Sequence, residues 1–254
     1  MHLDMNKVTN WSIVVAAAAV IGVCILDLRR LNASDTAIPH HEPFPGPVMA
    51  AAAPPADMLT AAAETVDDVE FSIPQSEASL ARVVVVEFSD YQCPYCGRYA
   101  RDTYPRLRTE FIETGRVEYV VKNFPLERIH PFALNAGKAV FCAAAQERTV
   151  EMRFLLFDNQ ESIGPNTTIK LASDLALDMR GFRACMASPQ TTRRVRADYN
   201  EGVAVGVRGT PTFLFGTRKD HNTVTISKML SGAQTYEVFE AILKRLENPK
   251  VSTN

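Results

Sequence analysis

The stretch VVVVEFSDYQCPYC, residues 83–96, decides the fold of this chain. Its first six residues are a nearly continuous β-branched run, which is typical of a strand buried in the centre of a sheet. Its end holds two cysteines, Cys93 and Cys96, with Pro94 between them. Proline suits the first turn of a helix, because that position needs no N–H donor. We therefore expect a strand, a turn and a helix in succession, with Cys93 at the helix N-terminus.

The spacing of Cys93 and Cys96 favours redox chemistry. Two cysteines with two residues between them can close a small disulfide ring, and a helix N-terminus favours a thiolate. A thiolate of low pKa is both a nucleophile and a good leaving group, as thiol–disulfide exchange requires. Half of a zinc site is the alternative, but it needs more ligands nearby. No second closely spaced pair is formed by the other cysteines, Cys24, Cys142 and Cys185, so we expect no metal.

Composition narrows the class of protein. The chain has 254 residues and 46% apolar content, which is enough for one domain of good size and additional segments. Its formal net charge is −2 and it has no long basic run, so nothing indicates nucleic-acid binding. Five cysteines are too few for a disulfide scaffold.

The N-terminal region differs in character from the rest. Residues 11–26 are apolar except for Ser12 and Gly22. A helix of that length spans about 24 Å, against about 30 Å for a bilayer core, and Asp27 and Leu28 extend it. We expect residues 1–28 to form a signal anchor or transmembrane helix. A cleaved signal peptide is the alternative, but Arg29-Arg30 follow directly where a small-residue cleavage site would lie.

Residues 29–65 read as a flexible linker, rich in proline and alanine. Six of the fifteen prolines lie between Pro39 and Pro55, and such a segment buries little apolar surface. The folded domain is expected over 66–248, followed by a tail at 249–254. Within the domain, helix-type periodicity dominates from His130 to about Val205. The other expected elements are an edge strand at 69–73, a strand at 83–88, a helix from 94 to about 114 kinked at Pro105 and stopped by Gly115, strands at 117–124, 212–215 and 223–229, and a helix at about 235–247.

This order of elements, the CxxC pair and Gly209-Thr210-Pro211-Thr212 together resemble the thioredoxin superfamily, and more closely its DsbA-like branch. The segments that carry the resemblance are FSDYQCPYC at 88–96, VKNFPL at 121–126, FCA at 141–143, LLFDNQ at 155–160 and VRGTPTF at 207–213. It covers roughly 68–248. The resemblance implies an α/β thioredoxin fold with a helical domain inserted at about 127–205.

The resemblance also implies roles for individual residues. Cys93 is the exposed attacking sulfur and Cys96 its buried partner, so the redox-active disulfide serves in place of an organic cofactor. A cis peptide at Pro211 brings the chain close to the Cys93 sulfur, where the backbone of Thr210 pairs with an extended protein substrate that carries cysteine. Pro94 and Tyr95, between the cysteines, are expected to contact substrate and to tune the potential.

The direction of the reaction stays open. Tyr95 stands where the strongest oxidants of the branch carry histidine, and the Pro-Tyr pair also occurs in reductases and isomerases. We expect a protein disulfide oxidoreductase that works more as an oxidase. The alternatives are a reductase or isomerase of the same fold, or a chaperone-type peptide-binding module, against which the intact CxxC argues.

We infer the cellular location from the disulfide chemistry and not from the charged residues that flank the apolar segment. Lys7 before the apolar segment and Arg29 and Arg30 after it would place the C-terminal side in the cytoplasm by a positive-inside count. Disulfide enzymes mostly work in oxidising compartments. We expect an anchor in the bacterial inner membrane with the catalytic domain in the periplasm, or secretion after signal cleavage. The expected redox partner is a quinone-linked oxidase or reductase in the membrane.

Two charges interrupt apolar strands, Glu87 and Lys122. They are either solvated strand ends or a buried pair beneath the active site that moves protons for Cys96 and tunes its pKa. The resemblance favours the catalytic pair. Cys142 and Cys185 both fall in the helical block, as two buried thiols or as a structural disulfide of the kind found in some DsbA-like relatives. For an oxidising compartment we expect the disulfide.

Overall fold

The computed structural model describes residues 63–73 and 81–248. The anchor expected at 1–28, the linker up to residue 62 and the tail at 249–254 lie outside the described residues. Within the described ranges, no helix is both long enough and apolar enough to cross a membrane.

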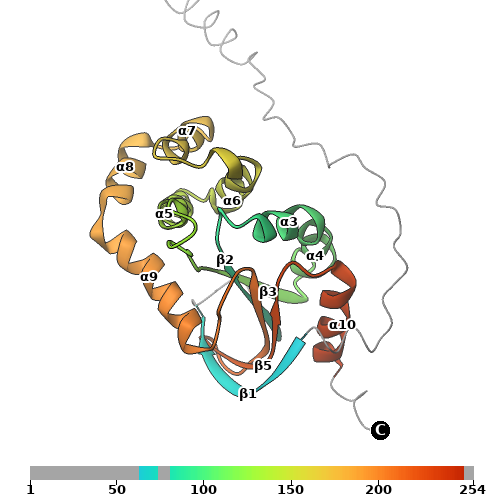
Figure 1. Cartoon of the computed structure of the whole chain (residues 1–254). Coiled ribbons are helices and arrows are strands. Elements are labelled where there is room, and N and C mark those ends of the chain that lie inside the picture. Colours follow the sequence, from blue (N-terminus) through green and yellow to red (C-terminus); the bar gives the residue numbers. More distant parts are fainter. Residues whose placement is uncertain (1–62, 74–80, 249–254) are drawn as a thin grey trace, which may run out of the picture. The chain divides into compact units, whose positions relative to one another are not determined.

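Five strands form one mixed sheet in the order β1-β5-β4-β2-β3 (Figure 1). β2 runs parallel to β3, and the other neighbouring pairs are antiparallel. All seven residues of β2 are buried, which confirms the expected interior strand. β1 is the expected edge strand but begins earlier than residue 69. The strands are β1 (Ala63–Ser72), β2 (Val83–Ser89), β3 (Val117–Asn123), β4 (Thr212–Arg218) and β5 (Thr223–Ser231).

The helical segment after β2 is broken where one kinked helix was expected. α3 (Pro94–Asp102) ends at Thr103, and α4 (Tyr104–Leu107) and a π-helical turn η1 (Arg108–Ile112) follow. Pro105 lacks the N–H that would bond the carbonyl four residues earlier, so the helix cannot run through this point. The segment ends near Gly115, whose φ of 71° is a left-handed conformation that glycine adopts readily.

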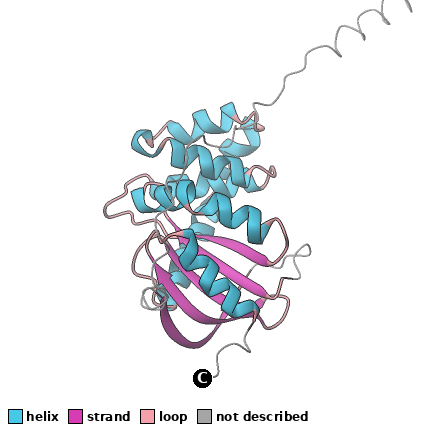
Figure 2. Cartoon of the chain, turned by 90° about the vertical axis from the view of Figure 1, so that its right-hand side faces the viewer, coloured by secondary structure: helices cyan, strands magenta, loops and turns pink. Residues whose placement is uncertain are grey.

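The helical block lies between β3 and β4 in the chain, within the range expected for the insertion. Figure 2 shows helices gathered apart from the sheet, and α10 (Tyr236–Glu247) crossing its face. The block comprises α5 (Ala133–Ala144), α6 (Thr149–Asp158), a 3-10 turn η2 (Gln160–Ser162), α7 (Thr167–Asp174), α8 (Met179–Ala187) and α9 (Pro189–Ala204). A disulfide joins Cys142 on α5 to Cys185 on α8, with Cα atoms 5.7 Å apart, as expected.

Alternate residues of β2 pack into two different hydrophobic cores. Val83 and Val85 pack with buried side chains of α3, α4, η1 and α10. Val84, Val86 and Phe88 pack on the opposite side with residues of β1, β5 and the end of α9. Because successive strand residues point to opposite faces, Glu87 lies on the side of Val83 and Val85.

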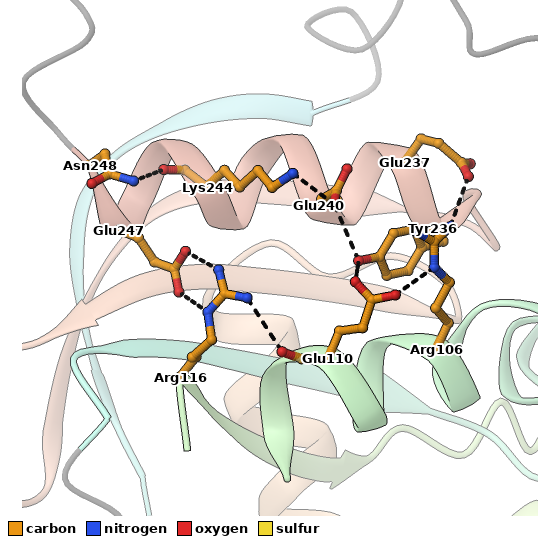
Figure 3. A network of polar contacts seen from close by, with 9 residues as sticks. All are labelled: Arg106, Glu110, Arg116, Tyr236, Glu237, Glu240, Lys244, Glu247 and Asn248. Carbon is orange, nitrogen blue, oxygen red and sulfur yellow. Dashed lines mark hydrogen bonds and ion pairs between the residues drawn. The ribbon is translucent and has the colours of Figure 1, made fainter. Parts of the chain in front are cut away.

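A polar network holds α10 against α4 and η1 (Figure 3). The Glu110 carboxylate accepts hydrogen bonds from Arg106 Nε at 2.7 Å and from the Tyr236 hydroxyl at 2.6 Å. Arg116 donates twice to the Glu247 carboxylate, at 2.9 and 2.6 Å. These contacts join α10, the last described element, to the helical segment that begins at Cys93 and Cys96.

Candidate active site

Cys93 is the N-cap residue of α3, and Cys96 lies in its first turn. The Cys93 N–H donates to the Asp90 carbonyl at 3.1 Å, and its carbonyl accepts from the Gly97 N–H at 3.2 Å. Both cysteines are free thiols. The exposed fraction is 4% for Cys93 and 0% for Cys96. Cys93 is thus the more accessible of the two, as expected, but it is far more covered than an exposed sulfur would be.

The two thiols differ in acidity. The pKa of Cys93 is lowered to about 6, chiefly by its hydrogen bond with the Cys96 thiol and further by Thr210 and the N–H groups of Tyr95 and Cys96, although burial opposes the shift. The pKa of Cys96 is raised well above its usual range, chiefly by burial and then by its interaction with Cys93. Near neutral pH the site therefore holds one thiolate, at Cys93, and one thiol, at Cys96.

The loop before β4 covers the Cys93 sulfur. The Thr210–Pro211 peptide bond is cis, as the resemblance implied. In its protonated form the Cys93 thiol donates to the Thr210 carbonyl, which lies 3.3 Å from the sulfur and 117 positions away in sequence. Pro211 is buried, and its carbonyl accepts from the Gly232 N–H at 2.8 Å. The backbone of Thr210 is thus placed beside the reactive sulfur.

Pro94 and Tyr95 form the solvent side of the site. Both are exposed, and 56% of Tyr95 is accessible. The Arg98 guanidinium carbon lies 5.2 Å from the centre of the Tyr95 ring, at cation–π distance. The two residues are therefore accessible to a molecule that approaches Cys93.

Gln160, on the turn η2 of the helical block, holds the cysteine turn by two hydrogen bonds. Its Nε2 donates to the carbonyls of Tyr91 at 2.9 Å and Cys93 at 2.8 Å. A Cβ on Gly97 would lie 2.0 Å from Gln160 Oε1, so only glycine leaves room for this amide. Sequence reasoning missed the role of Gln160, although it lies in the LLFDNQ stretch that carried the resemblance.

Asp90 fastens the loop after β3 to the cysteine turn. It is fully buried, and its Oδ1 accepts from the Gln92 N–H at 2.8 Å. Its Oδ2 accepts from the Leu126 N–H at 2.8 Å and lies 2.8 Å from His130 Nδ1. Sequence reasoning missed Asp90, although a carboxylate directly after a buried strand indicated a partner nearby.

The expected Glu87–Lys122 pair is wrong. Glu87 lies opposite Val121 in the β2–β3 ladder, so Lys122, one residue further on, points to the other face of the sheet. Lys122 Nζ instead lies 2.7 Å from Glu201 Oε2 and 3.5 Å from Asp198 Oδ1, both on α9. Lys122 thus joins the sheet to the helical block and takes no part in the Glu87 network.

Glu87 has a different partner, Arg153 of α6. Glu87 Oε2 accepts from Arg153 Nη2 at 2.8 Å and from the Tyr119 hydroxyl at 2.7 Å, and the Tyr99 and Tyr119 hydroxyls lie 2.8 Å apart. Glu87 Oε1 is buried without a partner among the described residues. The Glu87 charge also contributes, as a minor cause, to the raised pKa of Cys96. A buried polar chain therefore runs from the helical block to the sheet beneath the active site.

In the described ranges, no cluster of three His, Cys, Asp or Glu side chains could hold a metal ion. The site therefore offers two thiols with different pKa values, Cys93 and Cys96, beside the backbone of Thr210.

A CxxC turn at a helix N-terminus, opposite a cis-proline loop on a mixed sheet, defines a protein of the thioredoxin class. The family model described as Thioredoxin matches residues 78–244, more than half of the chain. The chain belongs to this thioredoxin family.

Solved structures share the fold at low sequence identity. Alpha-DsbA1 of Wolbachia pipientis is 18% identical and matches with a TM-score of 0.59, over 73% of this chain and 93% of that chain. Oxidised BdbD of Bacillus subtilis is 20% identical, with a TM-score of 0.55 over 72% of this chain and 100% of that one. Both support the thioredoxin-like fold that the resemblance implied.

Curated relatives are partial matches. A protein named Na(+)/H(+) antiporter NhaA 3 from Salinispora tropica is 34% identical over 149 residues, which is 59% of this chain and 22% of that protein. A protein named Na(+)/H(+) antiporter NhaA from Herminiimonas arsenicoxydans is 32% identical over 165 residues, 62% of this chain and 26% of that protein. The chain spans about a quarter of the length of these relatives.

Proposed function

We propose that this protein is a thiol:disulfide oxidoreductase that exchanges disulfides with cysteine-containing protein substrates. The observation that carries the proposal is the placement of two free thiols at the start of α3, with Cys93 beside the cis Thr210–Pro211 bond and Cys96 fully buried. This placement lowers the pKa of Cys93 to about 6 and raises that of Cys96. The likeness to DsbA proteins and to BdbD supports the same chemistry. No organic cofactor is needed, because the Cys93–Cys96 disulfide itself accepts the electrons.

The reaction proceeds in two exchanges. A substrate thiolate attacks the Cys93 sulfur of the oxidised protein; the Cys93–Cys96 bond breaks, and Cys96 leaves and takes up a proton. A second substrate thiolate then attacks the substrate sulfur of the mixed disulfide and releases Cys93 as a thiolate. Two electrons pass from the substrate to the cysteine pair, and the substrate gains one disulfide. The Thr210 backbone and the exposed Pro94 and Tyr95 hold the substrate chain.

Glu87 supports the proton transfer at Cys96. It is the carboxylate of the buried network with Arg153 and Tyr119, and its unpartnered Oε1 is the atom that would pass a proton to or from Cys96. After the first exchange Cys96 stays a thiol chiefly because burial and then Cys93 raise its pKa, and the negative charge of Glu87 adds to this as a minor cause. No catalytic role is proposed for Lys122, since it points to the opposite face of the sheet.

We favour the oxidising direction. A stabilised Cys93 thiolate stabilises the reduced protein, so the oxidised form gives up its disulfide readily. The deciding experiment is the equilibrium potential of the Cys93–Cys96 pair against glutathione. A value near −120 mV, that of a strong oxidant, supports an oxidase, and one near −270 mV supports a reductase. Failure of the pair to equilibrate with glutathione, or full exchange activity in Cys93→Ser, contradicts the proposal.

The cellular setting is a separate proposal. We place the catalytic domain on the extracytoplasmic side of a bacterial inner membrane, tethered by residues 1–28 and reoxidised by a quinone-linked membrane protein. The support is the disulfide Cys142–Cys185, since such bonds persist in oxidising compartments. A reporter that is active only outside the cytoplasm, fused after Asn254, should be active, and an inactive reporter contradicts this location.

A further inference from the structure

A cavity of about 410 Å³ lies beside the active site and is not used by the exchange chemistry. Its lining combines the loop after β3, one face of α9 and the segment before the cis-proline. The lining residues are Pro125, Leu126, Glu127, Arg128, Ile129, Arg196, Tyr199 and Arg208. A cavity of this size accommodates one or two side chains of a bound peptide.

Two of its walls are linked to Cys93. Arg208 lies two residues before Thr210, whose carbonyl accepts the hydrogen bond of the Cys93 thiol. The Leu126 N–H on the opposite wall is bonded to Asp90, and the Asp90 carbonyl in turn accepts from the Cys93 N–H. An extended peptide rises about 3.3 Å per residue. Arg208 lies two residues, at most about 7 Å, from Thr210, so a chain paired with Thr210 reaches the Arg208 wall within about two to four residues of its cysteine.

The cavity carries an excess of positive charge. Arg128, Arg196 and Arg208 are all exposed, and Glu127 is the one acidic residue in the lining. Glu127 is paired with Arg196 at 3.2 Å. Among the described residues, Arg128 and Arg208 have no hydrogen-bond or ion-pair partner. Two guanidinium groups are thus free to bind carboxylates, for which their planar fork is well suited.

The same cavity offers an apolar surface. Ile129 is 69% exposed, the highest value among the large hydrophobic side chains of the described residues. Tyr199 stacks on Phe124 with ring centroids 4.5 Å apart, which fixes its ring as the cavity wall. An exposed isoleucine in the same lining as two unpaired arginines matches a ligand with both an apolar and an acidic side chain.

We propose that this cavity selects substrates, and that it binds an acidic side chain together with an apolar neighbour, two to four residues from the substrate cysteine. The inference rests on the proposed exchange function and adds a preference among protein substrates. Arg128 and Arg208 are the residues that set the preference, and they act on binding rather than on the sulfur chemistry.

The test uses short peptides with two cysteines and one leucine, identical except for Glu, Gln or Lys at positions two to four residues from the first cysteine. The oxidised full-length protein is mixed with each peptide, and the second-order rate constant of the exchange is measured from the appearance of reduced protein. We expect the Glu peptide to exceed the Lys peptide about fivefold at low salt, a ratio typical of one exposed ion pair. High salt should reduce this ratio, because it screens exposed charges.

Variants assign the preference to the cavity. Arg128→Gln/Arg208→Gln should bring the Glu-to-Lys ratio close to one, and Arg208→Glu should invert it. The matched control is Arg183→Gln, which removes an exposed arginine of α8 that does not line the cavity; it should keep the wild-type ratio.

The outcomes separate the two proposals. Oxidation of all peptides at equal rates overturns the cavity inference and leaves the exchange function intact. An equal loss of preference in Arg183→Gln and in the double variant also overturns the inference, since the effect would then come from net charge alone. No oxidation of any peptide overturns the exchange function itself.

Discussion

Cys93 gains its acidity from several small contacts, none of which involves a charged partner. Its sulfur lies at the N-terminus of α3, near the N–H groups of Tyr95 and Cys96, and shares a hydrogen bond with the Cys96 thiol. Burial raises the pKa of Cys93, but these hydrogen bonds lower it by more. Tyr95 supplies no positive charge, so these contacts maintain the low pKa without the histidine found in the strongest oxidants of the DsbA-like branch.

The first prediction concerns this pKa. The rate of alkylation of the reduced protein by iodoacetamide should rise with pH through a midpoint near 6, because the thiolate is the reacting species. Cys93→Ser should remove this phase and leave only the slower reactions of Cys24 and Cys96. A midpoint at or above about 8.5, the value of a free cysteine, would show that the contacts do not stabilise the thiolate.

The same shift makes the stability of the reduced protein depend on pH. Because the pKa of Cys93 is lower in the folded state than in the unfolded state, its thiolate stabilises the folded state at pH values above the unfolded pKa. This contribution is lost as the pH falls through about 6. The melting temperature of reduced wild type relative to Cys93→Ser should therefore rise between pH 6 and about pH 8.5. Above that range the raised pKa of Cys96 acts in the opposite direction.

The second prediction concerns Gly97. A methyl group there meets the Gln160 amide at 2.0 Å and must displace it from the Tyr91 and Cys93 carbonyls. Loss of these bonds should lower the free energy of unfolding by about 1–3 kcal/mol. Gly97→Ala and Gln160→Ala should not add in the double variant, because both remove the same contacts. If the two single losses of unfolding free energy, measured by urea unfolding, add fully in the double variant, the methyl group does not act through Gln160.

At the scale of elements, the sequence predicted β2, the start of α3, the cis-proline loop and the extent of the helical block. β2, the start of α3 and the helical block depend on local signals: a β-branched run, a proline after a cysteine and helical periodicity. The cis-proline loop was expected only from the resemblance to the DsbA-like branch, since a Thr-Pro pair alone usually marks a simple turn. The predicted partner of Glu87, Lys122, was wrong. Strand register decides which face of the sheet a residue occupies, and the register cannot be read from the sequence. One signal was present: Arg153 is a charge surrounded by apolar residues in α6.

The third prediction concerns this pair between elements. Glu87→Gln leaves the Arg153 guanidinium buried without its counter-ion, so the free energy of unfolding should fall by about 3–5 kcal/mol. Tyr119→Phe, which removes one hydrogen bond to the same carboxylate, should cost only about 1 kcal/mol. In Glu87→Leu/Arg153→Met, much of the stability should return. A double variant as unstable as Glu87→Leu alone would show that the buried charge is not the cause.

The kinetics of Glu87→Gln separate its proposed role in proton transfer from stability. If Glu87 exchanges protons with Cys96, the variant should slow disulfide exchange with a small peptide at temperatures where it is fully folded. Tyr119→Phe serves as the matched control for disturbance of the network. Unchanged exchange rates in folded Glu87→Gln would leave the carboxylate with a structural role only.

At the scale of the whole molecule, the helical block and the thioredoxin-like sheet depend on each other. The block contributes Gln160 to the cysteine turn and Arg153 to Glu87, and its helix α9 pairs with Lys122 of β3. The active site is thus held between two parts of the chain that are far apart in sequence. Whatever stabilises the block should also stabilise the site.

The disulfide Cys142–Cys185 is the covalent part of that support, and its removal is the fourth prediction. It closes a loop with a sequence separation of 43, for which the chain-entropy relation gives about 4 kcal/mol of stabilisation. Cys142→Ala/Cys185→Ala should lower the free energy of unfolding by about 2–4 kcal/mol. Hydrogen exchange should accelerate first in α5 and α8 and more weakly in β2, since the bond lies within the block.

Thiol counting tests whether this bond forms in solution. The chain has five cysteines, so unreduced and denatured Cys93→Ser/Cys96→Ser protein retains Cys24, Cys142 and Cys185. With the disulfide formed, only Cys24 should react with a thiol reagent, whereas all three react if the bond is absent. Three reactive thiols in protein isolated from an oxidising compartment would remove both the bond and the argument that it supports the active site. A single reactive thiol would link the folding of this domain to such a compartment, because reduction would weaken the block that holds Gln160 and Arg153 in place.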